Sequence, residues 1–212
     1  MNELITFSLL SFTSFFTLIN PLGVMPVYMT MTSGLTTKER TKTARKAVIT
    51  SFFILLAFAF SGQLLFDFFG ISVDSFRIAG GIIFFMVGQD MLHARLTTVK
   101  VREDEIHKYV NDISITPLAI PMLAGPGSIT NAIVLMEDAG TFELKMVLIG
   151  TLISVLVITF IILWGAAKIS KFLGETGNNI LMRIMGLIVM VIAVEFFFSG
   201  LGPILRKIFI TN

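Results

Sequence analysis

Two proline-interrupted stretches lie inside long apolar runs of this 212-residue sequence. They are NPLGVMP at 20–26 and TPLAIPMLAGPGSITN at 116–131. Proline removes a backbone donor and breaks a helix, while glycine lets a ligand approach the backbone closely. In apolar surroundings the freed N–H and C=O groups need partners, and a small polar solute can supply them.

The second stretch has the residue types that suit a solute with a carboxylate. We expect Ser128 to cap a new half-helix after the GPG turn, so that free N–H groups and a positive dipole end face the membrane interior. Freed carbonyls near Asn20 and Thr116 suit an ammonium group or a coupling cation. The alternative is that the prolines only kink two packed helices. The candidate substrate-binding residues are Asn20, Pro21, Gly23, Thr116, Pro117, Gly125, Gly127, Ser128, Thr130 and Asn131.

Polar side chains inside other apolar runs are a second class of candidate, because they are costly in a membrane and are usually functional. Glu195 lies near the middle of the last apolar run, and Gln89 occupies the corresponding position of the third. We interpret Glu195, Gln89 and Asp90 as coupling-ion or buried polar residues, with Glu195 coupling transport to sodium or protons. Two alternatives stay open: Glu195 forms an internal hydrogen bond that locks the helices, and Asp90 lies at the membrane interface.

The composition indicates that the chain lies in a lipid bilayer, and its helices must position these residues there. Hydrophobic residues make up 55% of the chain, charged residues 14%, and the mean hydropathy is +0.88. Ordinary soluble domains carry about 25% charged residues. Runs of about 20 apolar residues are long enough to cross a bilayer as helices. The sequence predicts six such helices, at 4–37, 47–66, 73–93, 113–136, 146–167 and 179–205.

The two halves of the sequence contain similar motifs in the same order. PLG at 21–23 resembles PLA at 117–119, FFG at 68–70 resembles FLG at 172–174, and Arg-Ile-x-Gly opens both the third and the sixth run. Three helices per copy is an odd number, so the second copy must be inverted in the membrane. We therefore predict an all-α membrane protein of two inverted three-helix repeats, 1–95 and 113–212, in which helices one and four are broken. A polar cytoplasmic loop, 96–112, would join the repeats.

The distribution of positive charge predicts the orientation. Most of the 16 lysines and arginines fall in the connections after the first, third and fifth runs. By the positive-inside rule these connections are cytoplasmic, and both termini lie outside. The N-terminus is a poor secretory signal, so we expect the first helix to stay in the protein.

The sequence lacks residues and motifs that several other functions require. The absence of cysteine excludes thiol catalysis and cysteine-ligated metals, and no Walker A sequence indicates ATP drive. Neither histidine has metal-ligand spacing. We expect no enzymatic activity, no cofactor beyond a coupling sodium ion or proton, and no nucleic-acid partner. A homo-oligomer is left open.

The NPLG segment, the PLAIPMLAGPGSIT segment and the six-helix layout with a polar central loop resemble the MarC family of bacterial integral membrane proteins. The resemblance covers essentially the whole chain. It implies a multi-pass protein of the bacterial inner membrane and, because the family includes such a transporter, transport of small neutral amino acids such as glycine and alanine. A passive channel, a non-transporting sensor and a transporter of another small solute stay open as alternatives.

Overall fold

The computed structural model describes residues 3–93 and 106–210, which form helices and contain no strand. The prediction of an all-α membrane protein is confirmed. In chain order the elements are α1 (Glu3–Ile19), α2 (Pro21–Met31), α3 (Thr37–Phe69), α4 (Val73–Leu92), α5 (Ile106–Ile113), the π-helical segment η2 (Ser114–Leu123), α6 (Pro126–Asp138) and α7 (Phe142–Ile210).

The candidate membrane spans correspond to the six apolar runs of the sequence. Among the described residues, five helical stretches are long and apolar enough to cross a membrane: Glu3–Met31, Thr37–Gly62, Val73–Leu92, Phe142–Ala166 and Met182–Phe209. A sixth span results if Tyr109–Leu123 and Pro126–Asp138, which are bent by 59° at the break between them, are counted together. The predicted breaks in helices one and four are therefore present.

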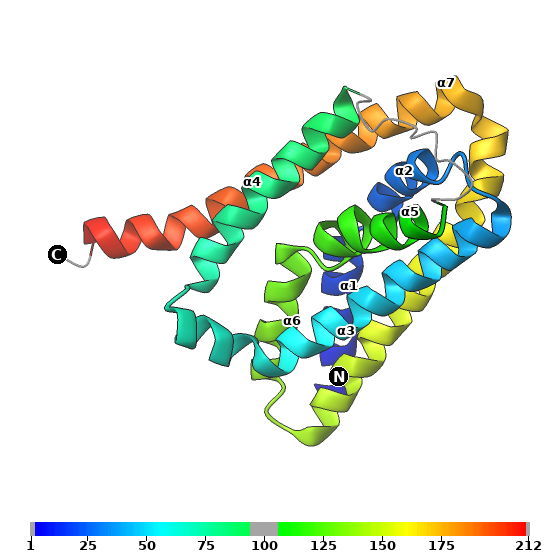
Figure 1. The fold of residues 1–212 in the computed structure, drawn as a ribbon. Coiled ribbons are helices and arrows are strands. Elements are labelled where there is room, and N and C mark those ends of the chain that lie inside the picture. The colour runs from blue at the N-terminus through cyan, green and yellow to red at the C-terminus, as the bar shows by residue number, and fades with distance from the viewer. Residues whose placement is uncertain (1–2, 94–105, 211–212) are drawn as a thin grey trace.

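The last two spans belong to one element, α7, which turns back at Gly174. The backbone of Gly174 has φ 66°, in the left-handed region that glycine enters without a steric penalty. In Figure 1 the two halves of α7 consequently run in different directions, from yellow-green through the bend to red.

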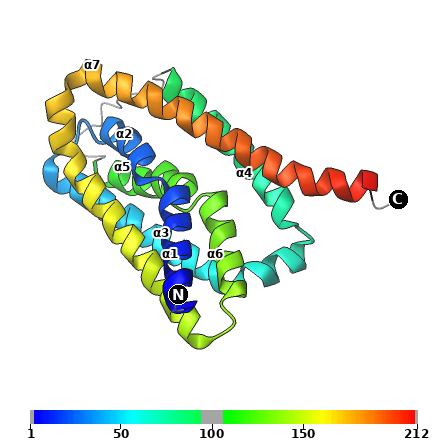
Figure 2. The ribbon, with the colours of Figure 1, turned by 180° about the vertical axis from the view of Figure 1, so that it is seen from behind.

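The helices surround a central group made of α1, α2 and α6. In Figures 1 and 2, α3 runs beside the first half of α7, and α4 lies along its second half. α6 contacts both α3 and α4. The broken helices one and four therefore lie inside a frame formed by α3, α4 and α7.

Small residues allow α4 and the second half of α7 to pack closely and antiparallel. A Cβ atom added to Gly81 would lie 2.8 Å from the carbonyl oxygen of Ala193, and one added to Gly88 would lie 2.9 Å from that of Gly186. The sequence stretch AGGIIFFMVG, 79–88, predicts such packing. The antiparallel pairing of the third and sixth spans is compatible with inverted repeats.

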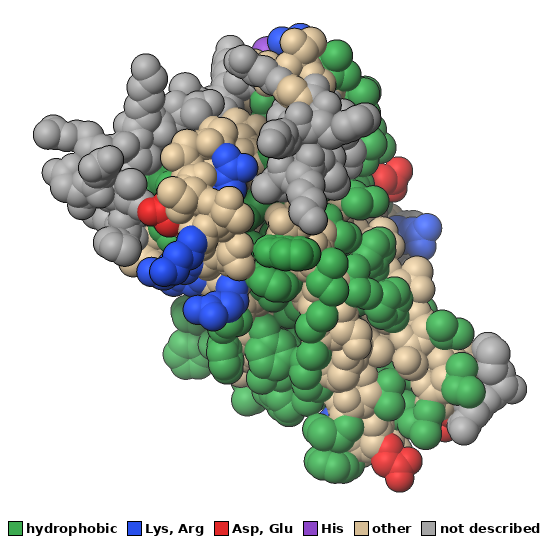
Figure 3. Space-filling model, turned by 90° about the vertical axis from the view of Figure 1, so that its right-hand side faces the viewer, with side chains coloured by type: hydrophobic (Ala, Val, Ile, Leu, Met, Phe, Trp, Pro, Cys, Tyr) green, Lys and Arg blue, Asp and Glu red, His purple; other side chains and the backbone are tan. Residues whose placement is uncertain are grey.

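Large hydrophobic side chains cover the outside of the bundle as well as its core. Phe15, Ile19 and Leu118 are buried, whereas Phe53 and Leu64 are exposed. Figure 3 shows a broad hydrophobic surface along one flank. Such a surface is stable in contact with lipid, where the helical backbone satisfies its own hydrogen bonds.

The later part of the predicted polar loop is ordered as a helix. Residues 106–112 belong to α5, whose Tyr109 hydroxyl donates to the carbonyl oxygen of Met31 at 3.0 Å. Val110 is buried against Leu35. The α5 helix therefore packs on the end of α2, a long-range contact that the polar composition of 96–112 does not reveal. Residues 96–105 of the predicted loop lie outside the described residues.

Candidate functional site

The first break is organised by Asn20, which separates α1 from α2. Its backbone is left-handed, with φ 46°, and its side-chain Oδ1 accepts a hydrogen bond from the backbone N–H of Gly23 at 3.1 Å. Pro21 occupies the first turn of α2, where a missing N–H costs nothing. A Cβ on Gly23 would lie 2.4 Å from Asn20 Nδ2, so the turn requires glycine there. The Asn20 Oδ1 atom consequently already accepts a hydrogen bond from within the protein.

The second break has two parts. The backbone is extended at Thr116 and again at Ile120, and α6 then begins at Pro126 with Gly125 as its N-cap. Ser128 is therefore the third residue of α6, and the prediction that it is the N-cap residue is wrong, although its hydroxyl contributes to the cap from inside the helix. Its Oγ instead accepts from Gly125 N–H at 3.1 Å and donates to the carbonyl oxygen of Leu123 at 2.8 Å.

Replacing Ser128 by alanine should reduce stability, with an indirect effect on ligand binding. The variant leaves the N–H of Gly125 and the carbonyl oxygen of Leu123 without the partner that they share, and a lost N-terminal capping interaction costs about 1 kcal/mol. Chemical denaturation of the purified protein measures this loss. Unchanged stability would contradict the role of Ser128 in holding the turn.

A polar cavity of about 310 Å³ lies where α4, α6 and α7 meet, with Leu18 of α1 in its wall. Its polar lining comes from Arg77 on α4, Thr130 and Asn131 on α6, and Ser199 on α7. The cavity thus combines residues from both halves of the chain. Its remaining lining includes Gly127, Val134 and Phe196.

Two groups on the α6 side of this cavity have unused hydrogen-bonding capacity. Thr130 is only 3% exposed, and its Oγ1 has no hydrogen-bond partner among the described residues. The same is true of the buried Nδ2 atom of Asn131. A buried polar group without a partner costs about 1–3 kcal/mol. A polar ligand in the cavity would remove that cost.

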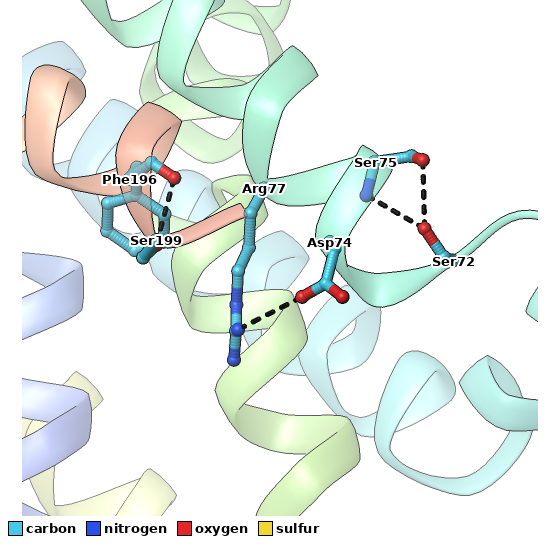
Figure 4. Close-up of polar contacts among 6 residues, drawn as sticks. All are labelled: Ser72, Asp74, Ser75, Arg77, Phe196 and Ser199. Atoms are coloured by element: carbon cyan, nitrogen blue, oxygen red, sulfur yellow. Dashed lines mark hydrogen bonds and ion pairs between the residues drawn. The ribbon is translucent and has the colours of Figure 1, made fainter. Parts of the chain in front are cut away.

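Arg77 supplies the positive charge of the cavity. Figure 4 shows its guanidinium extending past Asp74 toward α6. Its Nη1 is 3.5 Å from Asp74 Oδ1, longer than the 2.7–2.9 Å of a strong charged hydrogen bond, and both side chains are 31% exposed. From the sequence we expect Arg77 to snorkel to the headgroups, with pairing to Asp74 or Glu195 as the alternative. The structure shows the contact with Asp74, but the position of Arg77 in a cavity is not predicted from the sequence. An arginine in the first turns of a membrane helix, three residues after an aspartate, is the one signal that could have found it.

Gly200 explains how α7 comes so close to Arg77. An added Cβ at this position would lie 2.4 Å from the carbonyl oxygen of Asp74 and 3.0 Å from Arg77 Cβ. Close contact here places Ser199 and Phe196 beside the arginine (Figure 4). The Ser199 hydroxyl donates to the carbonyl oxygen of Phe196, within its own helix.

One aromatic ring lines each of two neighbouring cavities, which share Leu18 in their walls. A small apolar cavity of about 30 Å³ next to Asn20 and Gly23 is lined by Phe84, while Phe196 lines the polar cavity. The two ring centroids are 6.4 Å apart. Each ring also contacts the GPG turn, because a Cβ on Gly125 would lie 2.6 Å from Phe84 and one on Gly127 2.2 Å from Phe196.

The structure brings together only some of the predicted residues. Gly127, Thr130 and Asn131 line the polar cavity, Asn20 and Gly23 line the small one, and Gly125 shapes the turn between them. Thr116 is exposed, and neither it nor Pro117 lines these cavities. Pro21 is buried at the start of α2.

For the remaining polar candidates, the structure does not support the buried interpretation, while an interfacial position of Asp90 and the coupling role stay predictions. The side chains of Gln89, Asp90 and Glu195 are exposed on α4 and α7. The physical reason is that each of these two helices uses its glycine-rich side to pack against the other, which turns neighbouring positions outward. Glu195 nevertheless precedes Ser199 by four residues, and this spacing puts both on the same helix face.

The fold and the cavity define an integral membrane protein with several apolar helices and a polar cavity between them. A family model described as "MarC family integral membrane protein" matches residues 5–205. This chain belongs to the MarC family, which confirms the resemblance identified from the sequence.

Relatives in archaea and bacteria match nearly the whole chain. A UPF0056 membrane protein of Methanocaldococcus jannaschii is 40% identical over 195 residues, covering 91% of this chain and 95% of the relative. The UPF0056 membrane protein YvbG of Bacillus subtilis is 41% identical over 194 residues, with coverages of 90% and 92%. A UPF0056 membrane protein of Pyrococcus horikoshii is 36% identical over 201 residues, with coverages of 95% and 97%. No solved structure matches the chain.

Proposed function

We propose that this protein is a secondary transporter of small neutral amino acids, such as glycine and alanine, in the plasma membrane. The observation that carries the proposal is the cavity between α4, α6 and α7, which joins a guanidinium group to two buried polar atoms that have no partner in the described part of the chain. Its volume of about 310 Å³ is at the lower end of the roughly 300–1,000 Å³ of ligand pockets. This size favours a small solute.

The carboxylate of the amino acid is the group that the cavity suits best. Arg77 offers a fork of N–H donors, and Asn131 Nδ2 offers another. The first turn of α6 adds the N–H of Gly127 and the positive end of the helix dipole. The hydroxyl of Thr130 can donate to a carboxylate oxygen or accept from an ammonium group.

Alternating access requires that the cavity open to one side of the membrane at a time. Phe84 lines the small cavity at Asn20, Phe196 lines the polar cavity, and their ring centroids are 6.4 Å apart; the proposal is that a substrate moving between the two cavities displaces these rings. Both rings contact the GPG turn of the second repeat. The proposal is that the rings act as a barrier which moves when one group of helices rocks against the other.

Orientation and coupling complete the proposal. The charge distribution favours termini on the outer side of the membrane. Arg77, which lies near the start of α4, then faces the outer half of the membrane. Glu195 shares a helix face with Ser199 of the cavity, and we assign the coupling of transport to a proton or a sodium ion to this carboxylate.

Replacing Thr130 by valine should change stability and binding in opposite directions. Valine keeps the shape but removes a buried hydroxyl without a partner, so the free energy of unfolding should rise by about 1 kcal/mol, while glycine affinity falls about fivefold. Thermal unfolding and glycine titration measure the two effects. Thr159→Val is the matched control, because the buried Thr159 hydroxyl already donates to the carbonyl oxygen of Val155, at 2.8 Å. Equal glycine affinity in wild type and Thr130→Val would contradict the assignment.

Uptake of labelled glycine and alanine into proteoliposomes tests the proposed function. Sodium and proton gradients are imposed separately, and liposomes without protein are the control. Saturable uptake driven by one gradient is the expected result, and that gradient identifies the coupling ion. Uptake that does not saturate would instead indicate a passive channel. No uptake by protein shown to be folded and inserted would overturn the amino-acid assignment.

A further inference from the structure

We infer that Asp74 binds the ammonium group of the substrate while Arg77 binds its carboxylate, so that the pair selects zwitterions. The inference rests on the proposed function and specifies its substrate class. Its basis is the geometry of one helical turn, in which Arg77 lines the polar cavity and Asp74 lies beside Arg77 without lining the cavity itself.

The first observation is that the pair is loose and partly open. The 3.5 Å separation and the 31% exposure of both side chains leave most donors of the guanidinium and most lone pairs of the carboxylate unused by each other. Within the described part of the chain, Asp74 is the one ion-pair partner of Arg77. Both groups can therefore exchange contacts with each other for contacts with a ligand.

The second observation is that the remaining polar groups of the cavity converge on the same place. Arg77 shares the cavity lining with Asn131 and with Thr130, whose buried Oγ1 has no partner among residues 3–93 and 106–210 as far as their side chains are described. In Figure 4 the Asp74 carboxylate lies next to the Arg77 guanidinium and points to the same side of α4. A carboxylate bound between Arg77 and α6 would therefore place a neighbouring ammonium group within reach of Asp74.

The third observation concerns charge. An α-amino acid carries its ammonium and carboxylate groups on the same carbon atom, and the Asp74–Arg77 pair at i and i+3 presents opposite charges only 3.5 Å apart. A solute with a carboxylate alone would have to compete with Asp74 for Arg77 and would leave Asp74 without compensation. A solute with an amine alone would meet the corresponding penalty at Arg77. The pair therefore discriminates against both through unpaired charge.

The test compares three solutes on the wild type and on Asp74→Asn. Glycine carries both charges, propionate lacks the ammonium group, and glycinamide lacks the carboxylate. Each dissociation constant is measured by titration of the purified protein. In the wild type, glycine should bind about tenfold or more tightly than propionate or glycinamide. Each of these two solutes lacks one hydrogen bond to a charged group, and such a bond changes affinity by about this factor.

In Asp74→Asn the affinities for glycine and for propionate should change in opposite directions. Glycine affinity falls about tenfold because its ammonium group loses a partner, whereas propionate affinity rises about threefold because Arg77 loses a competitor. Asp74→Glu should recover part of the preference for glycine. Asp67→Asn, an exposed acid near the end of α3, is the matched control and should behave as the wild type.

A parallel fall in glycine and propionate affinity would overturn the inference, because Asp74 would then only position Arg77. Equal wild-type affinity for glycine and propionate would also overturn it, as would an unchanged pattern in Asp74→Asn. Failure of the wild type to bind any of the three solutes would instead refute the proposed function, and the inference with it. The two failures are therefore distinguishable.

Discussion

Replacing Arg77 by glutamine should weaken glycine binding by about 10- to 100-fold. A hydrogen bond to a charged group is worth about 1.5–3 kcal/mol, and every 1.4 kcal/mol is a factor of ten. Glutamine keeps much of the length of the side chain but removes the charge and the fork of donors. Arg77→Lys, which keeps the charge alone, should lie between the wild type and Arg77→Gln. Titration with glycine and the Michaelis constant for uptake report the effect.

The control for this prediction is Arg206→Gln, which removes a positive charge from an exposed position near the end of α7. It should leave glycine affinity unchanged. If Arg77→Gln bound glycine as tightly as the wild type does, Arg77 would not bind the carboxylate of glycine. An equal loss in both variants would point to the overall charge of the protein instead of this cavity.

Replacing Gly80 by alanine should separate the helices that form the cavity. The added Cβ would lie 2.1 Å from Pro126 Cβ and 2.4 Å from its Cγ, and the proline ring is too rigid to move aside. Overpacking of this kind costs about 1–3 kcal/mol. Because Pro126 begins α6, the movement also displaces Gly127 and Thr130 from Arg77. We expect a lower unfolding temperature and uptake reduced about tenfold or more.

A compensating change makes this prediction specific. Pro126→Gly removes the atoms that would clash, so the double variant Gly80→Ala with Pro126→Gly should recover part of the uptake that Gly80→Ala loses. Gly150→Ala is the control for added volume, since nothing lies within 4 Å of a Cβ at that position. Normal stability and uptake in Gly80→Ala would contradict the close contact of α4 with α6.

The helical architecture and both breaks follow from local sequence. Long uncharged runs predict the spans, because the hydrocarbon thickness fixes the length of a membrane helix. Proline has the same effect on a helix wherever it stands, and the interruptions near Asn20 and Gly125 are therefore predictable from residue type. The same reasoning places Thr130 and Asn131 near the candidate site, because they follow the second break within two turns.

The composition of the cavity depends on packing between distant segments. Arg77 reaches the cavity because Gly200 lets α7 approach the first turns of α4, and no local pattern relates positions 77 and 200. Ser128 is a typical N-cap residue, but α6 begins two residues earlier, at Pro126. The hydroxyl of Ser128 instead holds the turn through its hydrogen bonds with Gly125 and Leu123. The exposure of Glu195 likewise depends on which side of α7 packs against α4. The polarity of Glu195 alone does not predict that side.

The proposed function requires that glycine occupy the cavity lined by Arg77, Thr130 and Ser199. Because the chain contains no cysteine, a single Ser199→Cys variant reports on this cavity without background. The natural hydroxyl of Ser199 bonds within its own helix, so the substitution should leave binding intact. The measurement is the rate at which a membrane-impermeant methanethiosulfonate modifies this variant, with and without glycine, compared with Gly140→Cys in the exposed connection before α7.

Glycine at ten times its dissociation constant leaves about a tenth of the cavities empty, so modification of Ser199→Cys should slow about tenfold. The rate for Gly140→Cys should not change. A rate for Ser199→Cys that is the same with and without glycine, in protein that binds glycine, would show that the amino acid binds elsewhere and would contradict the account.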